Sequence, residues 1–382
     1  MGDNCTIEWV AALAKQRNAI PASLNPIRGC SRLSEACRNC YAAGIAHRFG
    51  HKGNGIWAGL TDLDPDGTPR FNGTLRWVPE VLTTAINAKR SRVYFVCDMS
   101  DLFHARVDQD WIDQVFAMMA LCRHHHFLLL TKRPDRMRRY LTARETPYRI
   151  NRCLYRLGGQ SNRAGDQHFA LKVLDESDKD RLPDWPLPNV WTGATVEDQA
   201  EADERVADLM LCPSVRRYLS VEPMLGPVDL TRIVLDECEA TFLHDPRLTR
   251  ARFTLNALTG AQSLRLPPLD WVICGGESGP KARPISRRWV RELQEQCTSA
   301  GRPFFFKQWG EWEPAGMCPA GTAGRFAFGD YDFDRTCFHQ VEGYPRQFDM
   351  FGARAVMKRV GKKASGRLLD GRTWDEVPEV RP

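Results

Sequence analysis

The chain has 382 residues, 43% hydrophobic and 26% charged, and this composition excludes a disordered chain, a collagen and a coiled-coil rod. The sequence contains no run of about 18 apolar residues, so it predicts no membrane-spanning helix. The first residues lack the apolar segment of a secretion signal. We therefore expect a cytoplasmic protein without membrane contact. In that compartment the 13 cysteines are expected to be thiols or metal ligands rather than disulfides.

Short apolar runs followed by polar residues recur along the chain, as expected of parallel strands that are buried on both faces. They cover residues 22–26, 93–97, 127–131, 190–194, 217–221, 271–274 and 304–307. Helical patterns lie between them at 110–121, 198–210 and 287–300. Such alternation predicts repeated βαβ units. The fold class is therefore α/β, with a partial or full (β/α) TIM-like barrel.

Three stretches depart from this alternation. Residues 141–188 and 233–268 interrupt it and are interpreted as insertions. The chain after residue 312 is rich in glycine, proline and aromatic residues and has little periodicity. We expect a barrel over residues 1–312 and an irregular C-terminal extension, packed on the barrel, over residues 313–382.

The net charge of +6, from 53 basic and 47 acidic residues, is unevenly distributed. Residues 131–165 hold ten basic and two acidic side chains, a net of +8, so the rest of the chain carries −2. A local basic excess is typical of a surface that binds a polyanion, nucleic acid first. A solvated helix face is the alternative interpretation.

Polar residues cluster directly after the predicted strands. They are Asp98, Ser100, Asp101, Lys132, Arg133, Thr195, Glu197, Glu222, Gly275, Gly276, Glu277 and Gln308. In a barrel these positions share the face that carries active sites, and in a doubly wound sheet they share one edge. Both topologies thus predict a common site, against the alternative that loops are simply polar.

The strongest local motif is a C-x6-C-x2-C run formed by Cys30, Cys37 and Cys40, on a loop that leaves the first predicted strand. Nearby arginines and a helix start favour thiolates over thiols. A closed zinc site needs four protein ligands, whereas a four-iron cluster held by three cysteines leaves one iron open. Zinc with His47 or His51 as fourth ligand, and thiols without metal, stay open as alternatives.

These residues resemble the radical S-adenosylmethionine superfamily and, more closely, a phage-associated three-Cys-motif family of largely uncharacterised proteins. The resemblance covers most of residues 20–312 and the extreme C-terminus. Its segments are Asn25–Ala42, Asp98–His104, Leu130–Pro134, Val196–Gln199, Ser220–Pro223, Gly275–Gly279, Phe305–Gly310 and Leu369–Arg372. The superfamily's usual spacing is C-x3-C-x2-C with an aromatic residue before the last cysteine. Here the first gap is six residues, and Asn39 holds that position while Tyr41 follows.

The resemblance implies a [4Fe-4S] cluster on Cys30, Cys37 and Cys40 that binds S-adenosylmethionine and generates a 5′-deoxyadenosyl radical. The residues it implies as cofactor contacts are Tyr41, Asp98, Met99, Ser100, Asp101, Thr195, Glu197, Ser220, Glu222, Gly275 and Gly276. Glu277, Lys132 and Lys307 are the expected catalytic residues. Arg133, His104, Gln308 and Trp309 are expected to bind substrate, with the tryptophan as a stacking surface for a base.

The phage-family context and the basic segment together point to DNA or a nucleotide as substrate. One version is DNA hypermodification by rearrangement of an amino-acid substituent on the thymine 5-methyl group. A flavodoxin- or ferredoxin-type protein is expected as the external one-electron donor. If the gene is phage-borne, the compartment is the host cytoplasm.

Two other classes of function are compatible with the sequence. The first is a non-catalytic, zinc-containing nucleic-acid-binding protein, which predicts a colourless protein with salt-sensitive DNA affinity. The second is a metal-dependent hydrolase that uses Asp98, Asp101 and His104 after a strand.

Overall fold

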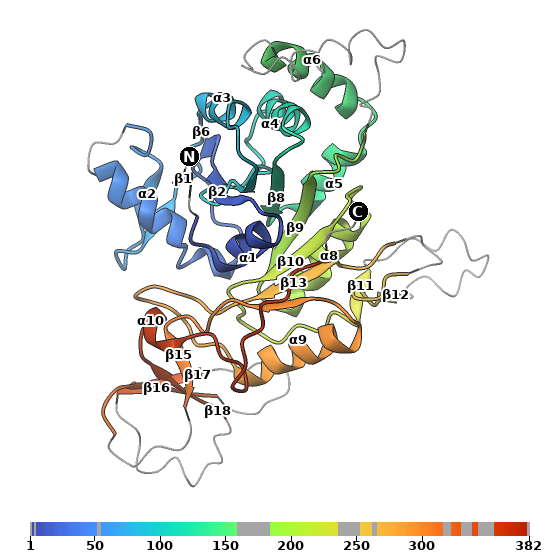
Figure 1. Ribbon diagram of the computed structural model, residues 1–382. Coiled ribbons are helices and arrows are strands. Elements are labelled where there is room, and N and C mark those ends of the chain that lie inside the picture. The colour runs from blue at the N-terminus through green and yellow to red at the C-terminus, as the bar shows by residue number, and fades with distance from the viewer. Residues whose placement is uncertain are drawn as a thin grey trace, which may run out of the picture. The chain divides into compact units, whose positions relative to one another are not determined.

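The computed structural model describes residues 2–3, 5–51, 55–158, 184–235, 253–261, 266–315, 322–329, 338–342 and 355–379 (Figure 1). The chain divides into two compact units. The first comprises residues 1–194, 208–218 and 379–382, and the second comprises residues 195–207 and 219–378. The division runs through two strands, β9 (Val190–Val196) and β10 (Arg217–Val221).

The largest sheet has the strand order β1-β2-β7-β8-β9-β10-β13-β14. Its other members are β1 (Gly2–Asp3), β2 (Ile20–Leu24), β7 (Arg92–Val96), β8 (His126–Thr131), β13 (Trp271–Cys274) and β14 (Phe304–Phe306). From β2 onward the seven described strands are parallel and neighbours in chain order, and only β1 pairs antiparallel. A doubly wound sheet would reverse this order at a switch point. The predicted α/β class is confirmed, and the curled parallel sheet forms a half-barrel that is compatible with a partial TIM-like topology.

Burial explains why these strands could be found from sequence. All residues of β9, β10 and β13 are buried, as are the last four of β7. Strands covered on both faces need continuous apolar runs. The predicted strand at 22–26 begins two residues earlier, at Ile20.

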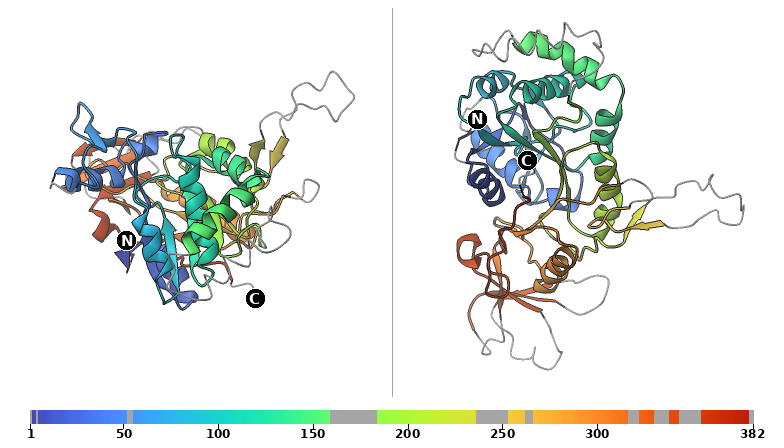
Figure 2. Two further views of the ribbon diagram at one scale, coloured as in Figure 1. Left: turned by 90° about the horizontal axis from the view of Figure 1, so that it is seen from above. Right: turned by 45° about the vertical axis from the view of Figure 1, so that its right-hand side comes forward.

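Helices of the first unit flank its strands: α1 (Glu8–Gln16), α3 (Glu80–Ile86), α4 (Gln109–Leu121), α5 (Pro134–Thr142) and α6 (Thr146–Gly158). The N-cap Asp108 begins α4 by accepting a hydrogen bond from Asp110 N at 3.0 Å. Both α3 and α6 pack on α4, as the two views in Figure 2 show. The α6 helix falls in the first predicted insertion, of which residues 159–183 lie outside the described part of the chain.

A small substructure separates β2 from β7. It contains the ladder of β3 (Ile27–Arg28) with β6 (Arg76–Trp77), the hairpin of β4 (Thr61–Leu63) with β5 (Pro69–Phe71), the 3-10 turn η1 (Glu35–Cys37), and α2 (Tyr41–His51). Ala43, Leu60 and Phe71 belong to its own hydrophobic cluster, and Cys30 and Cys40 pack against that cluster. The cysteine loop therefore rests on a core of its own.

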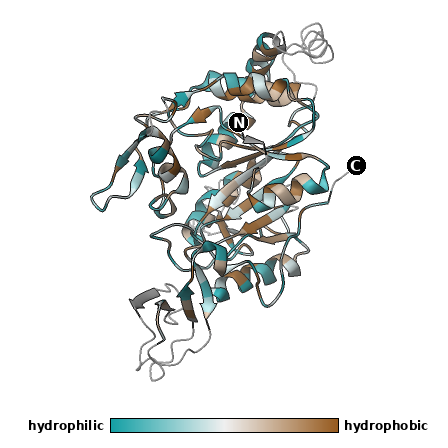
Figure 3. Ribbon diagram, turned by 60° about the vertical axis from the view of Figure 1, so that its left-hand side comes forward, coloured by the Kyte–Doolittle hydropathy of each residue, from teal (hydrophilic) through white to brown (hydrophobic). Residues whose placement is uncertain are grey.

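The second unit contains α9 (Arg287–Ser299), the hairpin of β11 (Ile233–Leu235) with β12 (Phe253–Leu255), and α10 (Lys362–Ser365). The helix α8 (Gln199–Leu211) runs from this unit into the first. The predicted helices at 110–121, 198–210 and 287–300 correspond to α4, α8 and α9. Helices carry hydrophilic and hydrophobic residues side by side, as Figure 3 shows by colour.

The chain after residue 312 differs from the irregular extension that was expected. It forms a four-stranded antiparallel sheet in the order β15-β18-β16-β17. Its strands are β15 (Trp312–Ala315), β16 (Arg325–Gly329), β17 (Phe338–Glu342) and β18 (Ala355–Arg359). They are short and mix polar with apolar residues without alternation, so periodicity gives no signal.

Across the described ranges, no helix combines the length and the apolar character that crossing a membrane requires.

Candidate functional site: the cysteine loop and the strand ends

The cysteine loop is held at both ends. It begins at Gly29, whose φ of +88° is left-handed and where a Cβ atom would lie 2.1 Å from the Thr74 carbonyl oxygen. The Cys30 carbonyl oxygen then accepts a hydrogen bond from Gly73 N at 2.9 Å. At the other end, α2 begins directly after Cys40. The loop thus carries its three thiols between two fixed points.

Exposure separates these three thiols from most of the other cysteines. Among the ten cysteines in the described ranges, all are free and six are buried. Only Cys5, Cys30, Cys37 and Cys40 are partly exposed. The predicted apolar roles of Cys97 and Cys274 agree with their burial. Three of the four accessible thiols are therefore the predicted metal ligands.

The thiols differ in acidity because their surroundings differ. Burial raises the pKa of Cys30 to about 12, and the nearby Arg133 opposes this shift. Burial also raises the pKa of Cys40. At Cys37 burial is outweighed by the charge of Lys132 and by hydrogen bonds from Ser34 and Leu33, so its pKa is lowered. Lys132 therefore favours the thiolate at Cys37, whereas burial favours the neutral thiol at Cys30 and Cys40.

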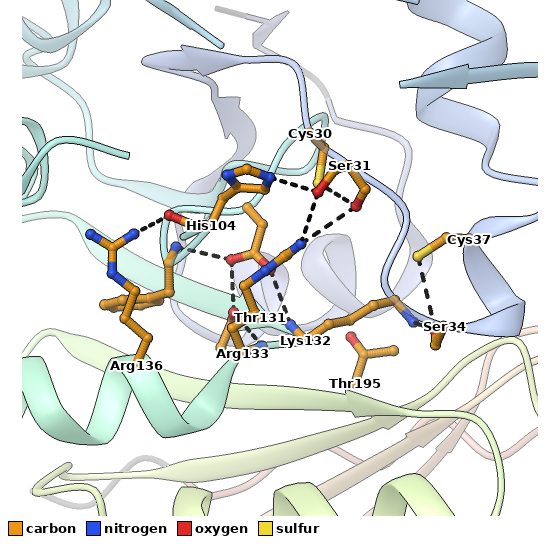
Figure 4. Close-up of polar contacts among 12 residues, drawn as sticks. Cys30, Ser31, Ser34, Cys37, His104, Thr131, Lys132, Arg133, Arg136 and Thr195 are labelled. Atoms are coloured by element: carbon orange, nitrogen blue, oxygen red, sulfur yellow. Dashed lines mark hydrogen bonds and ion pairs between the residues drawn. The ribbon is translucent and has the colours of Figure 1, made fainter. Parts of the chain in front are cut away.

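The two cations that follow β8 reach into the cysteine loop (Figure 4). Lys132 Nζ lies 3.5 Å from Ser34 Oγ, which is itself 3.9 Å from Cys37 Sγ. Arg133 Nη2 lies 3.4 Å from both the carbonyl and the hydroxyl oxygen of Ser31. The predicted residues Lys132 and Arg133 are thus brought to the loop that carries the thiols. The serines were not predicted, although they stand inside the motif itself.

Asp101 organises this region from the loop after β7. Its buried carboxylate pairs with Arg133 Nη1 at 2.7 Å and accepts from Thr131 Oγ1 at 2.7 Å and from Phe103 N at 2.9 Å. The backbone N–H of Lys132 donates to the same carboxylate at 3.3 Å. Because protein donors occupy both oxygens, this carboxylate positions Arg133 rather than offering free acceptors to a cofactor.

His104 is buried and fixed as a neutral donor. Its Nδ1 accepts from Arg106 N at 3.1 Å, so the ring proton is on Nε2, which donates to Ser31 Oγ at 2.7 Å. Burial lowers the pKa of His104 to about 4. Arg136 donates to the carbonyl oxygen of His104. With both nitrogens engaged, His104 has no lone pair for a metal ion, which disfavours the hydrolase hypothesis.

The start of the loop after β7 is tied to the cysteine loop. Asp98 accepts hydrogen bonds from Asn25 Nδ2 and, at 3.2 Å, from Ser23 Oγ, and burial raises its pKa. Tyr41 Oη donates to the Asp98 carbonyl oxygen at 2.6 Å.

Two further contacts join the same segments. Met99 N donates to Asn25 Oδ1 at 3.0 Å, and Ser100 Oγ donates to the Ile27 carbonyl oxygen at 2.9 Å. The predicted cofactor residues of the first unit, from Tyr41 to Asp101, are therefore brought together.

In the second unit each predicted acid is already paired with a cation. Glu197 and Arg205 form an ion pair of 2.8 Å and are 1% and 3% exposed. Glu277 binds the Arg283 guanidinium through both oxygens, at 2.7 and 2.9 Å. Glu222 pairs with Lys307 Nζ at 2.7 Å. These pairs give the predicted acids structural partners within their own unit.

The glycines after β13 allow close packing rather than an open surface. A Cβ at Gly275 would lie 3.3 Å from Glu222 Oε1, and one at Gly276 would lie 2.2 Å from the Trp309 carbonyl oxygen. Trp309 is 2% exposed, and its ring packs on Phe306, so the expected stacking face is covered. The tryptophan therefore serves the core rather than offering a face to a base.

The remaining predicted contacts of this unit are also enclosed. Gln308 is buried and donates to the Gly276 carbonyl oxygen at 2.8 Å, but its own Oε1 has no hydrogen-bond partner in the structure as described. Thr195 and Ser220 are buried at the ends of their strands. The side-chain oxygen of Gln308 is thus a buried acceptor without a partner among the described residues.

The donor set fits an iron–sulfur cluster in its chemistry: three free, partly exposed thiols on one loop, with cations beside them. Over the described residues, no three His, Cys, Asp or Glu side chains are grouped as a site for a metal ion. His47, a zinc candidate from the sequence, contacts Thr61 Oγ1 at 3.1 Å, and its ring packs on His51 at 4.3 Å.

Fold and site together define an α/β protein with a partial barrel topology and a three-thiol loop after its first parallel strand. A family model described as "Protein of unknown function (DUF5131)" matches residues 4–378, and the chain belongs to this family. No curated protein matches the chain, and no solved structure matches it.

Proposed function

We propose that the protein is a radical S-adenosylmethionine enzyme that acts on a nucleobase in DNA or on a nucleotide. The observation that carries this proposal is the state of the thiols. Cys30, Cys37 and Cys40 are free, partly exposed and placed on one anchored loop, while six other described cysteines are buried. The six buried cysteines fit the role of small apolar core residues, whereas these three residues keep part of their surface exposed on one loop.

Cys30, Cys37 and Cys40 are the residues that would hold a [4Fe-4S] cluster. When bound, the cluster and S-adenosylmethionine supply a 5′-deoxyadenosyl radical that removes a hydrogen atom from substrate. Lys132 and Arg133 stabilise the anionic ligand set, and Asp101 holds Arg133 in place. The chain's contribution is thus to orient ligands and balance their charge.

The substrate class rests on the family resemblance more than on surface charge. Five arginines of the basic segment form ion pairs: Arg133, Arg138, Arg139, Arg149 and Arg156 pair with Asp101, Asp208, Asp135, Asp113 and Asp110. Four of these acids lie outside residues 131–165 and therefore reduce the +8 excess, whereas Asp135 is already counted in it. Our specific proposal is rearrangement of an amino-acid substituent on the thymine 5-methyl group, with electrons from a flavodoxin- or ferredoxin-type donor.

Anaerobic reconstitution with iron and sulfide tests the class of enzyme. We expect about four iron atoms per chain, a brown protein, an electron paramagnetic resonance signal after reduction, and 5′-deoxyadenosine from S-adenosylmethionine. The triple variant C30A/C37A/C40A should lose all of these. Cys5→Ala is the matched control, because Cys5 is also free and partly exposed but lies outside the loop.

Three outcomes contradict the proposal. A four-iron signal that persists in the triple variant contradicts the assignment of Cys30, Cys37 and Cys40 as cluster ligands. Absence of iron uptake by the wild-type protein contradicts the proposed iron–sulfur cofactor. One zinc per colourless chain, lost in the triple variant, favours the zinc-containing nucleic-acid-binding protein instead.

A further inference from the structure

Arg28 is a buried cation with an unpartnered Nε–H donor. Its side chain lies on β3, two residues before Cys30, and is 9% exposed. Its Nε is fully enclosed and has no hydrogen-bond partner among the described residues. A guanidinium carries five N–H donors, and leaving even the enclosed Nε–H without an acceptor is costly. Such an exception in a folded chain calls for an explanation.

The position of Arg28 is prepared by its neighbours. Its guanidinium carbon lies 4.7 Å from the centre of the Trp57 ring, a cation–π contact. Arg76 stands directly opposite Arg28 in the β3–β6 ladder, an arrangement that like charges make unfavourable. Arg76 donates to the carbonyl oxygens of Gly55 and Ala58, and so holds the turn that carries Trp57. Two residues thus fix the orientation of Arg28.

Arg28 also lies beside the predicted cofactor residues. Ser100 Oγ donates to the carbonyl oxygen of Ile27, and Gly29 forms a parallel bridge with Ser100. Asp98 acts electrostatically on Arg28, but its carboxylate accepts from Asn25 and Ser23 instead of forming an ion pair with the guanidinium. Asp98 therefore leaves the Nε–H donor of Arg28 unused.

We propose that Arg28 binds an oxyanion, a carboxylate or a phosphate, carried by a small ligand at the start of the cysteine loop. Arginine suits this task because its planar donors match both groups through paired hydrogen bonds. Two sources supply the same chemistry: the methionyl carboxylate of S-adenosylmethionine and the phosphate of a nucleotide. The first source rests on the proposed function, whereas the second is independent of the cluster.

Equilibrium dialysis on the full chain distinguishes the two sources. The probes form two matched pairs: S-adenosylmethionine with its decarboxylated analogue, and thymidine 5′-monophosphate with thymidine. We expect Arg28→Gln to weaken binding of one oxyanion-bearing probe about tenfold or more, and to leave its oxyanion-free partner unchanged. Arg38→Gln is the control, because Arg38 lies on the adjoining cysteine loop with a side chain that is 60% exposed.

Each result decides the inference. A loss confined to S-adenosylmethionine assigns the carboxylate, and a loss confined to the nucleotide assigns the phosphate. Wild-type protein that binds neither pair, or Arg28→Gln binding all probes within twofold of wild type, overturns it. If Arg28→Gln unfolds, Arg28→Met takes its place, because it removes the charge and keeps an unbranched side chain beside Trp57. Unchanged oxyanion affinity in that variant also overturns the inference.

The proposed function fails by different measurements. Wild-type protein without iron after reconstitution contradicts the radical enzyme, while nucleotide binding to the metal-free chain still tests Arg28. The converse result is that the enzyme with its cluster bound has the same affinity for S-adenosylmethionine and for the nucleotide in wild type and in Arg28→Gln. That result contradicts the proposed role of Arg28 and leaves the proposed function standing.

Discussion

The polar residues at the strand ends of the two units are used in different ways. In the first unit the acid Asp101 collects donors from the loops after β7 and β8 and holds Arg133 against the cysteine loop. In the second unit Glu197 and Glu277 pair with arginines only eight and six residues away. The first region joins distant loops around thiols. In the second, two of the three predicted acids close local ion pairs, and Glu222 pairs with the distant Lys307.

This contrast shows that the position of a polar residue in the sheet and its ion-pair partners tell different things about its function. A polar residue after a parallel strand lies at the edge where ligands bind. Its partners then decide whether it is free to meet a ligand. A buried carboxylate already paired with arginine contributes to the fold, and removing one partner leaves an uncompensated charge.

The largest effect is expected from Arg205→Met. The variant leaves the carboxylate of Glu197 buried without its cation, which should lower the free energy of unfolding by about 3–5 kcal/mol. Urea denaturation followed by circular dichroism measures this loss. The double variant E197Q/R205M should recover part of it. Iron bound per folded chain should stay at the wild-type level, and a drop in that ratio would break the comparison between the two regions.

A smaller effect on stability is expected from Asp101→Asn. Loss of this charge weakens the hydrogen bonds from Arg133 and Thr131 and should reduce the free energy of unfolding by about 1.5–3 kcal/mol. Unlike Arg205→Met, it should also lower iron retention after reconstitution, because Arg133 loses its anchor. Asp135→Asn, which removes only the exposed pair with Arg139, is the control. Full iron retention in Asp101→Asn would show that the hydrogen bonds of Asp101 with Arg133 and Thr131 do not contribute to iron binding at the thiols.

The smallest effect concerns pH. Burial holds the pKa of His104 at about 4, below its ordinary value of 6.5, so the unfolded chain takes up the proton first as pH falls. The stability contributed by neutral His104 is complete above pH 6.5 and is lost as pH falls toward 4. Urea midpoints measured from pH 7 to pH 4 should therefore decline less steeply in His104→Gln.

A second histidine provides the reference for that slope. His126 has a pKa of about 4 for the same main cause, burial, with Arg17 adding to it. Its contribution persists in wild type and in His104→Gln alike. Identical slopes in the two proteins would show that the ring of His104 is not held neutral by the fold.

The sequence predicted the elements whose signal is local. Continuous apolar runs marked β7, β9, β10 and β13 because these strands are buried, and the spacing of Cys30, Cys37 and Cys40 marked the accessible thiols. Pairing over long distances had no such signal. The sequence around Arg133 contains no pattern that predicts an ion pair with Asp101, which lies 32 residues earlier.

Arg28 and the basic segment both show that the sequence does not predict the partners of an arginine. Charge counting treated Arg138 and Arg149 as surface cations, but each meets an aspartate from another helix. Arg28 attracted no attention in the sequence, because its burial is produced by Trp57 and the β3–β6 ladder. Whether an arginine is neutralised or left without an acceptor is a tertiary property.

The segment near the end of the chain limits how the protein can be divided. Trp374 accepts a hydrogen bond from Phe306 N at 2.9 Å through its carbonyl oxygen, and Glu376 accepts from Phe304 N and from the Trp271 indole. These contacts cover the outer edge of β14, which would otherwise present unpaired backbone groups to other chains. A fragment that stops at residue 312 would expose that edge to aggregation. Domain-swapping and truncation experiments therefore need to keep residues 366–379 with the strands they cover.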